Sequence, residues 1–291
     1  MKRIFIPLLL ITLSLVSCAY FEEAPASRAV VVGMDYYPHA NSLSWCVTDA
    51  EAIAGSLGIE SGQIVQILAT RSPEVAISRW DILDSLEAAR LEAPNGFWDL
   101  FLFYYSGHGI DLSGDLVFSN YGDTVSNDII PPEDLLRAIA KVPARVRLVI
   151  LDSCFSGNFV KESPTVSPYP ADYSLGSELF SFPFSFKLLS YAASTYVKGS
   201  SGDIVVMSAA GSDELAWEDS TLKHGFFTAG LLKSREMGDT NRDGLVSLTE
   251  AYAYARDYIA KEWNQQYEAE AYMPRISGSP LDVTLFRTVK D

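Results

Sequence analysis

The sequence predicts an α/β domain in which a mainly parallel sheet of about six strands is flanked by helices. Short runs of β-branched and aromatic residues recur along the chain, with segments of helical spacing between them. The runs are almost continuously apolar, which is typical of strands buried on both faces of a parallel sheet. Their alternation with helical segments is the pattern of successive strand–helix–strand units.

The strands of this sheet are expected where the apolar runs lie. The runs cover residues 29–35, 64–69, 99–105, 147–152 and 203–209. Helical spacing follows over residues 48–57, 73–93, 131–140 and 226–237. Two prolines at 131 and 132 suit a first helical turn. Residues 281–288 alternate well enough to predict a final edge strand.

One segment, residues 155–202, breaks this rhythm. It holds four prolines and many Ser and Tyr residues, without the periodicity of a helix or a strand. We expect a long insertion at the surface, because loops of this length in compact domains usually carry function or move.

The N-terminus predicts export and a lipid anchor. Two basic residues precede an apolar run over residues 4–16, which ends at Ser17 and Cys18. The run is too short for a membrane span of about 20 residues, so residues 1–17 are interpreted as a signal peptide. Residues 15–18 resemble the lipobox of bacterial lipoproteins, which implies lipid on Cys18. An ordinary cleaved signal and a signal anchor are the alternatives.

The mature chain would be strongly acidic. Removing residues 1–17 from 291 leaves 274 residues, of which 18–27 form a tether and 28–291 the domain. Two of 22 basic residues are lost, so 20 face 37 acidic residues, a formal charge of −17. Such acidity argues against nucleic acid and favours cationic partners. We expect attachment to a bacterial membrane, on its periplasmic or cell-surface face, through the lipid alone.

Two chemically versatile residues follow strand ends. His108 comes just after the strand at 99–105, and Cys154 just after the strand at 147–152. If these strands are neighbours, both residues emerge at one edge of the sheet, where such folds bind ligands. A thiol needs a nearby base to become a thiolate near neutral pH. A turn histidine and a buried structural cysteine are the alternatives for each residue alone.

The segments around His108 and Cys154 resemble those of caspase-like cysteine peptidases, and of metacaspases more than animal caspases. They read Tyr105-Ser106-Gly107-His108-Gly109 and Asp152-Ser153-Cys154-Phe155-Ser156-Gly157. The Gln-Ala-Cys of animal caspases is not present before this cysteine. Weaker similarity extends over residues 29–236, including residues 43–50, 208–210 and 225–228. A caspase-like fold is thereby implied.

The resemblance implies a catalytic dyad. Cys154 matches the nucleophile, and His108 matches the general acid and base. The backbone N–H groups of Gly109 and Cys154 match the oxyanion hole. Protein or peptide substrates are implied, and no organic cofactor is expected.

The resemblance also implies a pocket for a basic side chain. Asp49 and Asp152 match its carboxylates, and Cys46 and Ser106 match further pocket positions. Two carboxylates suit a guanidinium or ammonium group, so cleavage after Arg or Lys is implied. A helix cap is the alternative for Asp49, and a turn residue is the alternative for Asp152.

One departure from the metacaspase pattern leaves other functions open. Phe155 replaces the histidine that usually follows the nucleophile. A catalytically silent surface protein, acting as a calcium-stabilised binding or scaffold module, is the main alternative, and a small-molecule hydrolase is another. In an active enzyme, self-cleavage is expected in the insertion, at Lys161, Lys187 or Lys198. Whether Cys46 and Cys154 form a disulfide stays open.

A calcium loop is predicted near the C-terminus. Residues 239–250 fit the twelve-residue EF-hand loop, with residues 226–237 and 248–263 as its helices. The expected ligands are Asp239, Asn241, Asp243, the carbonyl of Leu245, Ser247 and Glu250. A metal-free turn rich in Asp and Asn is the alternative.

Overall fold

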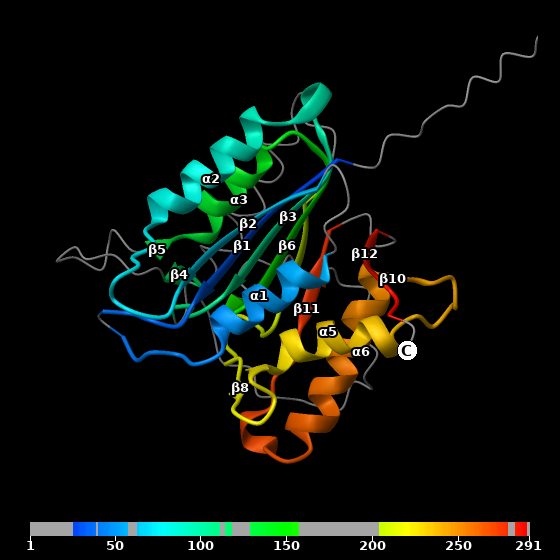
Figure 1. The fold of residues 1–291 in the computed structure, drawn as a ribbon. Coiled ribbons are helices and arrows are strands. Elements are labelled where there is room, and N and C mark those ends of the chain that lie inside the picture. The colour runs from blue at the N-terminus through cyan, green and yellow to red at the C-terminus, as the bar shows by residue number, and fades with distance from the viewer. Residues whose placement is uncertain are drawn as a thin grey trace, which may run out of the picture.

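The computed structural model describes residues 26–38, 40–57, 63–110, 114–117, 129–156, 204–278 and 283–289. A six-stranded sheet in the order β11-β7-β6-β3-β1-β2 runs through it (Figure 1). Its strands are β1 (Ser27–Met34), β2 (Gln63–Thr70), β3 (Trp98–Ser106), β6 (Ala144–Asp152), β7 (Ile204–Ser208) and β11 (Arg275–Ser277). Five of them pair in parallel, and β11 is antiparallel to β7. The predicted fold class is confirmed.

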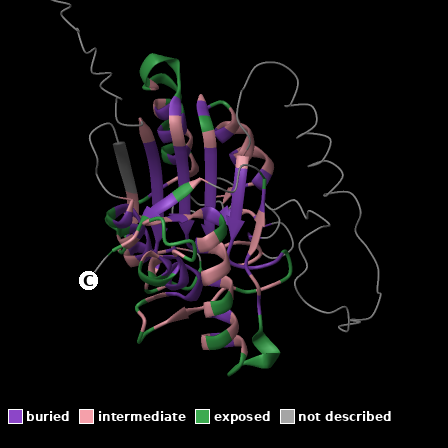
Figure 2. Ribbon diagram, turned by 90° about the vertical axis from the view of Figure 1, so that its right-hand side faces the viewer, coloured by how far each residue is buried: buried purple, intermediate pink, exposed green. Residues whose placement is uncertain are grey.

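Helices cover both faces of the sheet (Figure 1). One face carries α2 (Arg79–Leu91) and α3 (Pro132–Ala140), and the other carries α1 (Cys46–Ser56), α5 (Phe226–Met237) and α6 (Leu248–Ile259). Alternate strand residues enter two separate cores: Val31 and Tyr104 belong to the core with α5 and α6, Val30 and Phe103 to the core with α2 and α3. The central strands are therefore buried on both faces (Figure 2), as their apolar runs predict.

Shorter elements surround this framework. Three two-stranded sheets pair β4 (Leu116–Val117) with β5 (Ile129–Ile130), β8 (Glu218–Asp219) with β9 (His224–Gly225), and β10 (Leu245–Ser247) with β12 (Thr284–Arg287). Single turns are η1 (Pro94–Gly96), the π-helical η4 (Ala260–Asn264) and η5 (Glu268–Glu270).

The helices begin where polar side chains or prolines satisfy their first turn. The helix expected over 73–93 starts only at Arg79, because the Asp81 carboxylate accepts a hydrogen bond from Ser78 N at 2.7 Å and closes a capping box. The next helix starts at Pro132, whose missing N–H costs nothing in a first turn. The helix predicted over 226–237 has those bounds in the structure.

The expected final edge strand belongs to a different sheet. Residues 284–287 form β12, which pairs with β10 instead of the main sheet. Leu285 and Phe286 of β12 pack into the core that holds α5 and α6. One edge of the main sheet is β11, which is only three residues long, and the other is β2. The alternation of apolar and polar residues predicts a strand with one buried face, but it does not indicate with which sheet that strand pairs.

Some sequence predictions fall at or beyond the limits of the described residues. Strand β1 begins at Ser27, one residue before the boundary predicted at 28, and Ala26 N donates to the Asp99 carboxylate at 2.9 Å. The signal peptide at 1–17, Cys18, residues 19–25 and the insertion from 157 onward, with its three lysines, lie outside the described residues. None of the helices in the described ranges is long and apolar enough to cross a membrane.

Candidate active site

The two segments that carry the predicted dyad lie side by side. Strands β3 and β6 pair in parallel, with Ser106 opposite Asp152 in the register. Gly107 N continues the pairing with a 3.2 Å hydrogen bond to the Asp152 carbonyl. The expected adjacency of the two strands is confirmed, so His108 and Cys154 follow neighbouring strands at the same edge.

His108 is fixed through its backbone by two buried tyrosines. Its N–H donates to the Tyr37 hydroxyl at 2.8 Å, and its carbonyl accepts from the Tyr105 hydroxyl at 2.8 Å. The Tyr37 ring also packs on the imidazole, with ring centroids 4.5 Å apart. The imidazole Nε2 lies 2.7 Å from the Asn41 carbonyl oxygen. Since a carbonyl only accepts, Nε2 carries the hydrogen, and Nδ1 is the nitrogen left to take a proton.

Cys154 is half-buried and bonded to a neighbouring loop. Its Sγ donates to the Ala216 carbonyl at 3.7 Å, and burial raises the pKa of the thiol. The next residue, Phe155, has a φ of 56° and donates from its N–H to the Glu214 carbonyl at 2.9 Å. The thiol and the imidazole of His108 thus bond to different backbone carbonyls in this structure.

Gly109 brings the two segments of the predicted dyad together by close approach of their backbones. A Cβ at this position would lie 2.1 Å from the Cys154 carbonyl oxygen. Only a glycine leaves room for this contact. The contact places the two predicted oxyanion-hole residues against each other.

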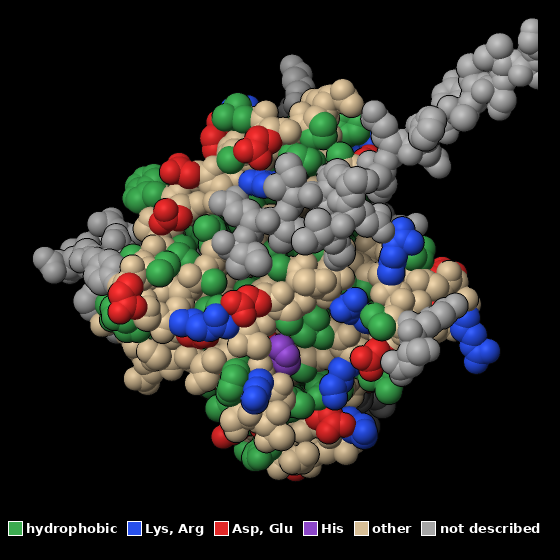
Figure 3. Space-filling view, viewed as in Figure 1, with side chains coloured by type: hydrophobic (Ala, Val, Ile, Leu, Met, Phe, Trp, Pro, Cys, Tyr) green, Lys and Arg blue, Asp and Glu red, His purple; other side chains and the backbone are tan. Residues whose placement is uncertain are grey.

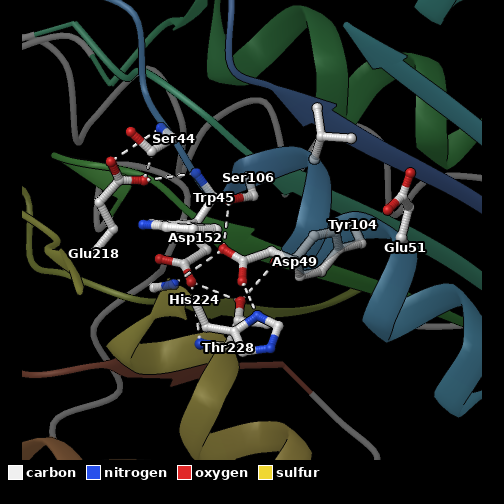
Figure 4. Close-up of polar contacts among 12 residues, drawn as sticks. Ser44, Trp45, Asp49, Glu51, Tyr104, Ser106, Asp152, Glu218, His224 and Thr228 are labelled. Atoms are coloured by element: carbon white, nitrogen blue, oxygen red, sulfur yellow. Dashed lines mark hydrogen bonds and ion pairs between the residues drawn. The ribbon is translucent and has the colours of Figure 1, made fainter. Parts of the chain in front are cut away.

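Asp49 is the centre of a buried acidic cluster. It lies in the first turn of α1, but its carboxylate bonds to other elements instead of capping the helix. Oδ1 lies 2.7 Å from Nδ1 of His224. Oδ2 accepts from the Ser106 hydroxyl at 3.1 Å and from Gly225 N at 3.2 Å (Figure 4). Burial raises the pKa of the Asp49 carboxyl, and the bond to His224 opposes that rise.

Asp152 completes the cluster from the end of β6. Its Oδ2 accepts from the backbone N–H of Thr228 at 3.1 Å and from the Thr228 hydroxyl at 2.6 Å. The Tyr104 hydroxyl lies 2.6 Å from that hydroxyl. Burial raises the pKa of the Asp152 carboxyl. A Cβ on Gly225 would lie 2.5 Å from Asp152 Oδ2, so the two carboxylates flank Gly225.

The remaining predicted pocket residues lie beside this cluster. Ser106 bonds directly to Asp49. Cys46 is buried at the start of α1, where burial raises the pKa of its thiol and the Ser106 hydroxyl partly offsets the rise. Cys46 and Cys154 are both free thiols.

Three residues of the cluster were missed by the sequence analysis. Thr228 and His224 bond to its two carboxylates, and Glu218 accepts from the backbone N–H groups of Ser44 and Trp45 just before α1. Residues 225–228 belong to the resemblance, and His224 directly precedes them. Since the chain has only three histidines, the position of His224 was the signal in the sequence that could have identified it. In contrast to this buried cluster, where the acidic side chains gather, the face of the molecule in Figure 3 shows acidic and basic side chains mixed together.

The predicted calcium loop has the turns of its motif without converging carboxylates. Gly244, its sixth residue, has a φ of 87°. Asp239 Oδ2 accepts from Gly244 N at 2.9 Å, and Asp243 Oδ1 accepts from Leu245 N at 2.8 Å. Glu250 caps α6, and hydrogen bonds from the Ser247 backbone lower its pKa to about 2. In the described ranges no three or more His, Cys, Asp or Glu side chains are gathered around a common metal position in the conformation seen here.

Comparison with known proteins identifies the family and the fold of the chain. The family model described as "Caspase domain" matches residues 26–286. Protein GSU0716 from Geobacter sulfurreducens is similar in structure, with a TM-score of 0.56 at 18% identity, over 91% of this chain and 100% of that one. Caspase-1 from Spodoptera frugiperda has a TM-score of 0.51 at 11% identity, over 87% and 88%. No curated protein matches. The chain belongs to the caspase-domain family of peptidases, which act on proteins or peptides.

Proposed function

We propose that this chain is a cysteine endopeptidase that cleaves peptide bonds after Arg or Lys. The observation that carries the proposal is the pair of buried carboxylates, Asp49 and Asp152, on the two sides of Gly225. They lie at the sheet edge where the segments of His108 and Cys154 emerge. A guanidinium or ammonium group would be attracted to this cluster, whereas an Asp side chain would be repelled.

The dyad would act by transfer of a proton between thiol and imidazole. Cys154 loses its proton to Nδ1 of His108 and attacks the substrate carbonyl carbon, and the backbone N–H groups of Gly109 and Cys154 stabilise the oxyanion. The imidazolium then gives the proton to the leaving amine. A water molecule, deprotonated by His108, hydrolyses the thioester and releases the acid. Attack requires the thiol to leave the Ala216 carbonyl.

The direct test is hydrolysis of fluorogenic peptides by residues 19–291. Peptides ending in Arg, Lys or Asp are compared, with and without calcium, for wild type and Cys154→Ala. Cleavage after Arg or Lys that is lost in the variant is expected. Cleavage after Asp alone would contradict the pocket assignment, and no cleavage by folded, reduced protein would contradict the peptidase.

A specific observation favours a second candidate, a catalytically silent binding or scaffold protein. The Cys154 thiol and the His108 imidazole bond to the carbonyls of Ala216 and Asn41, and Phe155 stands after the cysteine. A basic peptide chloromethylketone separates the two functions. An active dyad should be alkylated at Cys154, as intact mass would show, and a silent protein should not.

We also propose that residues 239–250 bind one calcium ion with a structural role. The order of oxygen-bearing side chains and the left-handed Gly244 support the site. Binding would require the Glu250 carboxylate to leave its bonds to Thr240. Calcium should raise the melting temperature of wild type, because it binds only the folded chain. Glu250→Gln should abolish that rise, and the exposed Glu236→Gln should keep it; equal responses would contradict the site.

The proposed location follows from the N-terminal residues alone. We propose that the chain is exported and anchored to a bacterial membrane by lipid on Cys18. Metabolic labelling with a fatty acid should mark the full-length chain, and Cys18→Ser should remove the label. Labelling that persists in this variant would contradict the anchor.

A further inference from the structure

His224 covers the acidic cluster on the side that faces solvent. Its side chain is 23% exposed, whereas that of Asp49, to which it bonds, is 2% exposed. The 2.7 Å contact joins Nδ1 of His224 to Oδ1 of Asp49 across 175 residues of sequence. The imidazole is therefore the exposed member of this pair, and Asp49 is almost completely closed off from solvent.

The position of His224 is set by a two-residue strand. Strand β9 consists of His224 and Gly225 and pairs with β8, where Asp219 lies opposite His224. Gly225 sits between the two carboxylates, which brings the preceding imidazole to Asp49. In Figure 4 the His224 ring points at the Asp49 carboxylate from the side of α5. Only a glycine at 225 leaves this space, because a Cβ there would strike Asp152.

The charges around His224 are mainly negative. Asp49 on α1 contacts it, and Asp152 on β6 shares an electrostatic interaction with it. Glu218 and Asp219 lie on the paired strand, and Lys223 precedes it. The His224 imidazole occupies Oδ1 of Asp49 at 2.7 Å, where a guanidinium or ammonium group of a substrate would otherwise bond.

We propose that His224 is a specificity-determining residue that occupies the cation position of the pocket until a basic substrate side chain displaces it. The inference rests on the proposed function, because it identifies what the basic side chain must replace in that pocket. Every basic substrate then loses part of its binding free energy to breaking the Asp49–His224 pair. His224 thus sets the affinity for Arg and Lys without taking part in bond cleavage.

The informative substitution is His224→Asn. The Asn side chain is shorter and carries no imidazole, so a substrate guanidinium no longer has to displace the His224 ring from Asp49. We expect the KM for Arg and Lys peptides to fall roughly tenfold, with kcat unchanged, which corresponds to about 1.4 kcal/mol. The KM for the uncharged citrulline peptide should stay within about twofold, since it gains no ion pair in either protein.

A matched control is Arg90→Gln. It removes a basic side chain from an exposed pair with Glu87 on α2, away from the cluster, and should leave every KM unchanged. An unchanged KM for basic peptides in His224→Asn would overturn the proposal. An equal rise of KM for basic and citrulline peptides would also overturn it, because that result indicates a purely structural role.

A binding measurement separates failure of this inference from failure of the proposed function. The chain has only three histidines, so ¹⁵N-histidine NMR of Cys154→Ala can follow the His224 ring, assigned by its absence in the double variant with His224→Asn. Agmatine, which carries a guanidinium, should shift the His224 resonances and bind the double variant roughly tenfold more tightly. If no protein cleaves peptides but these shifts appear, the endopeptidase fails and the displaceable histidine stands. If agmatine leaves His224 unmoved, the inference fails whatever the cleavage assay shows.

Discussion

The acidic cluster and the predicted dyad lie at the same edge of the sheet, yet they are held in different ways. In the cluster, Asp49 and Asp152 are buried and bond to groups from three other segments, around Ser106, Gly225 and Thr228. In the dyad, Cys154 and His108 are only half-buried, and each bonds to a backbone carbonyl of a separate loop.

This difference follows from the cost of burying charge. A buried carboxylate without partners is unstable, so the fold must bring donors to it. A half-buried thiol and imidazole can exchange their carbonyl partners at small cost. The core therefore holds the two carboxylates of the proposed pocket in place, whereas the proposed dyad would need a rearrangement of side chains before reaction.

Removing one carboxylate of the cluster should have the largest effect on activity. In Asp152→Asn the amide oxygen can still accept from the Thr228 N–H and hydroxyl, so the fold should persist. Losing the charge should lower kcat/KM for Arg and Lys peptides by roughly 100- to 1,000-fold, since a buried charge partner is worth about 3–4 kcal/mol. Steady-state kinetics would check this. A loss below tenfold would mean that Asp152 is not part of the pocket.

Disturbing the contact between the dyad segments should have the next largest effect. Gly109→Ala places a Cβ against the Cys154 carbonyl, so the backbone must shift. The expected loss is about 1–3 kcal/mol of unfolding free energy and roughly 100-fold in kcat. The control Gly55→Ala lies in α1 with nothing within 4 Å and should stabilise the chain by about 0.5–1 kcal/mol. Equal denaturation midpoints for the two variants would refute the contact.

Loosening the imidazole should have a smaller effect. Tyr37→Phe keeps the ring against the His108 imidazole but removes the acceptor of the His108 backbone N–H. We expect kcat to fall about tenfold with KM unchanged, because such a hydrogen bond is worth roughly 1 kcal/mol and orients only the base. Exposed Tyr267→Phe should change neither value. A change in KM alone would place Tyr37 in substrate binding instead.

The smallest expected effect is on the pH dependence of stability. Burial raises the pKa of Asp152 above its ordinary value of 3.8, so the folded state holds this proton more tightly than the unfolded state. Stability is then lost as pH rises through the raised pKa, and the loss is absent below pH 3.8. At pH 8, Asp152→Asn should be more stable than wild type by about 1–2 kcal/mol, with no gain at pH 3.5. Urea unfolding of both proteins at the two pH values measures this difference in stability. The same difference at pH 8 and at pH 3.5 would contradict a raised pKa of Asp152.

The sequence by itself determined the sheet and most of its strands, and it placed His108 and Cys154 directly after two strand ends. Buried parallel strands are nearly continuous apolar runs, so local composition was enough for this much. That the two strands are neighbours was a condition in the sequence argument, and the structure supplied it. The pocket carboxylates came from a resemblance in short motifs, not from any periodic pattern.

Only the tertiary structure decided which groups satisfy those carboxylates. The pair of Asp49 and His224 joins residues 175 positions apart, and β9 is too short to leave a pattern in the sequence. The same holds for β11, which takes the edge of the main sheet while the better-patterned β12 pairs with β10. Each choice depends on which elements pack together in space, and spacing along the chain does not contain that information.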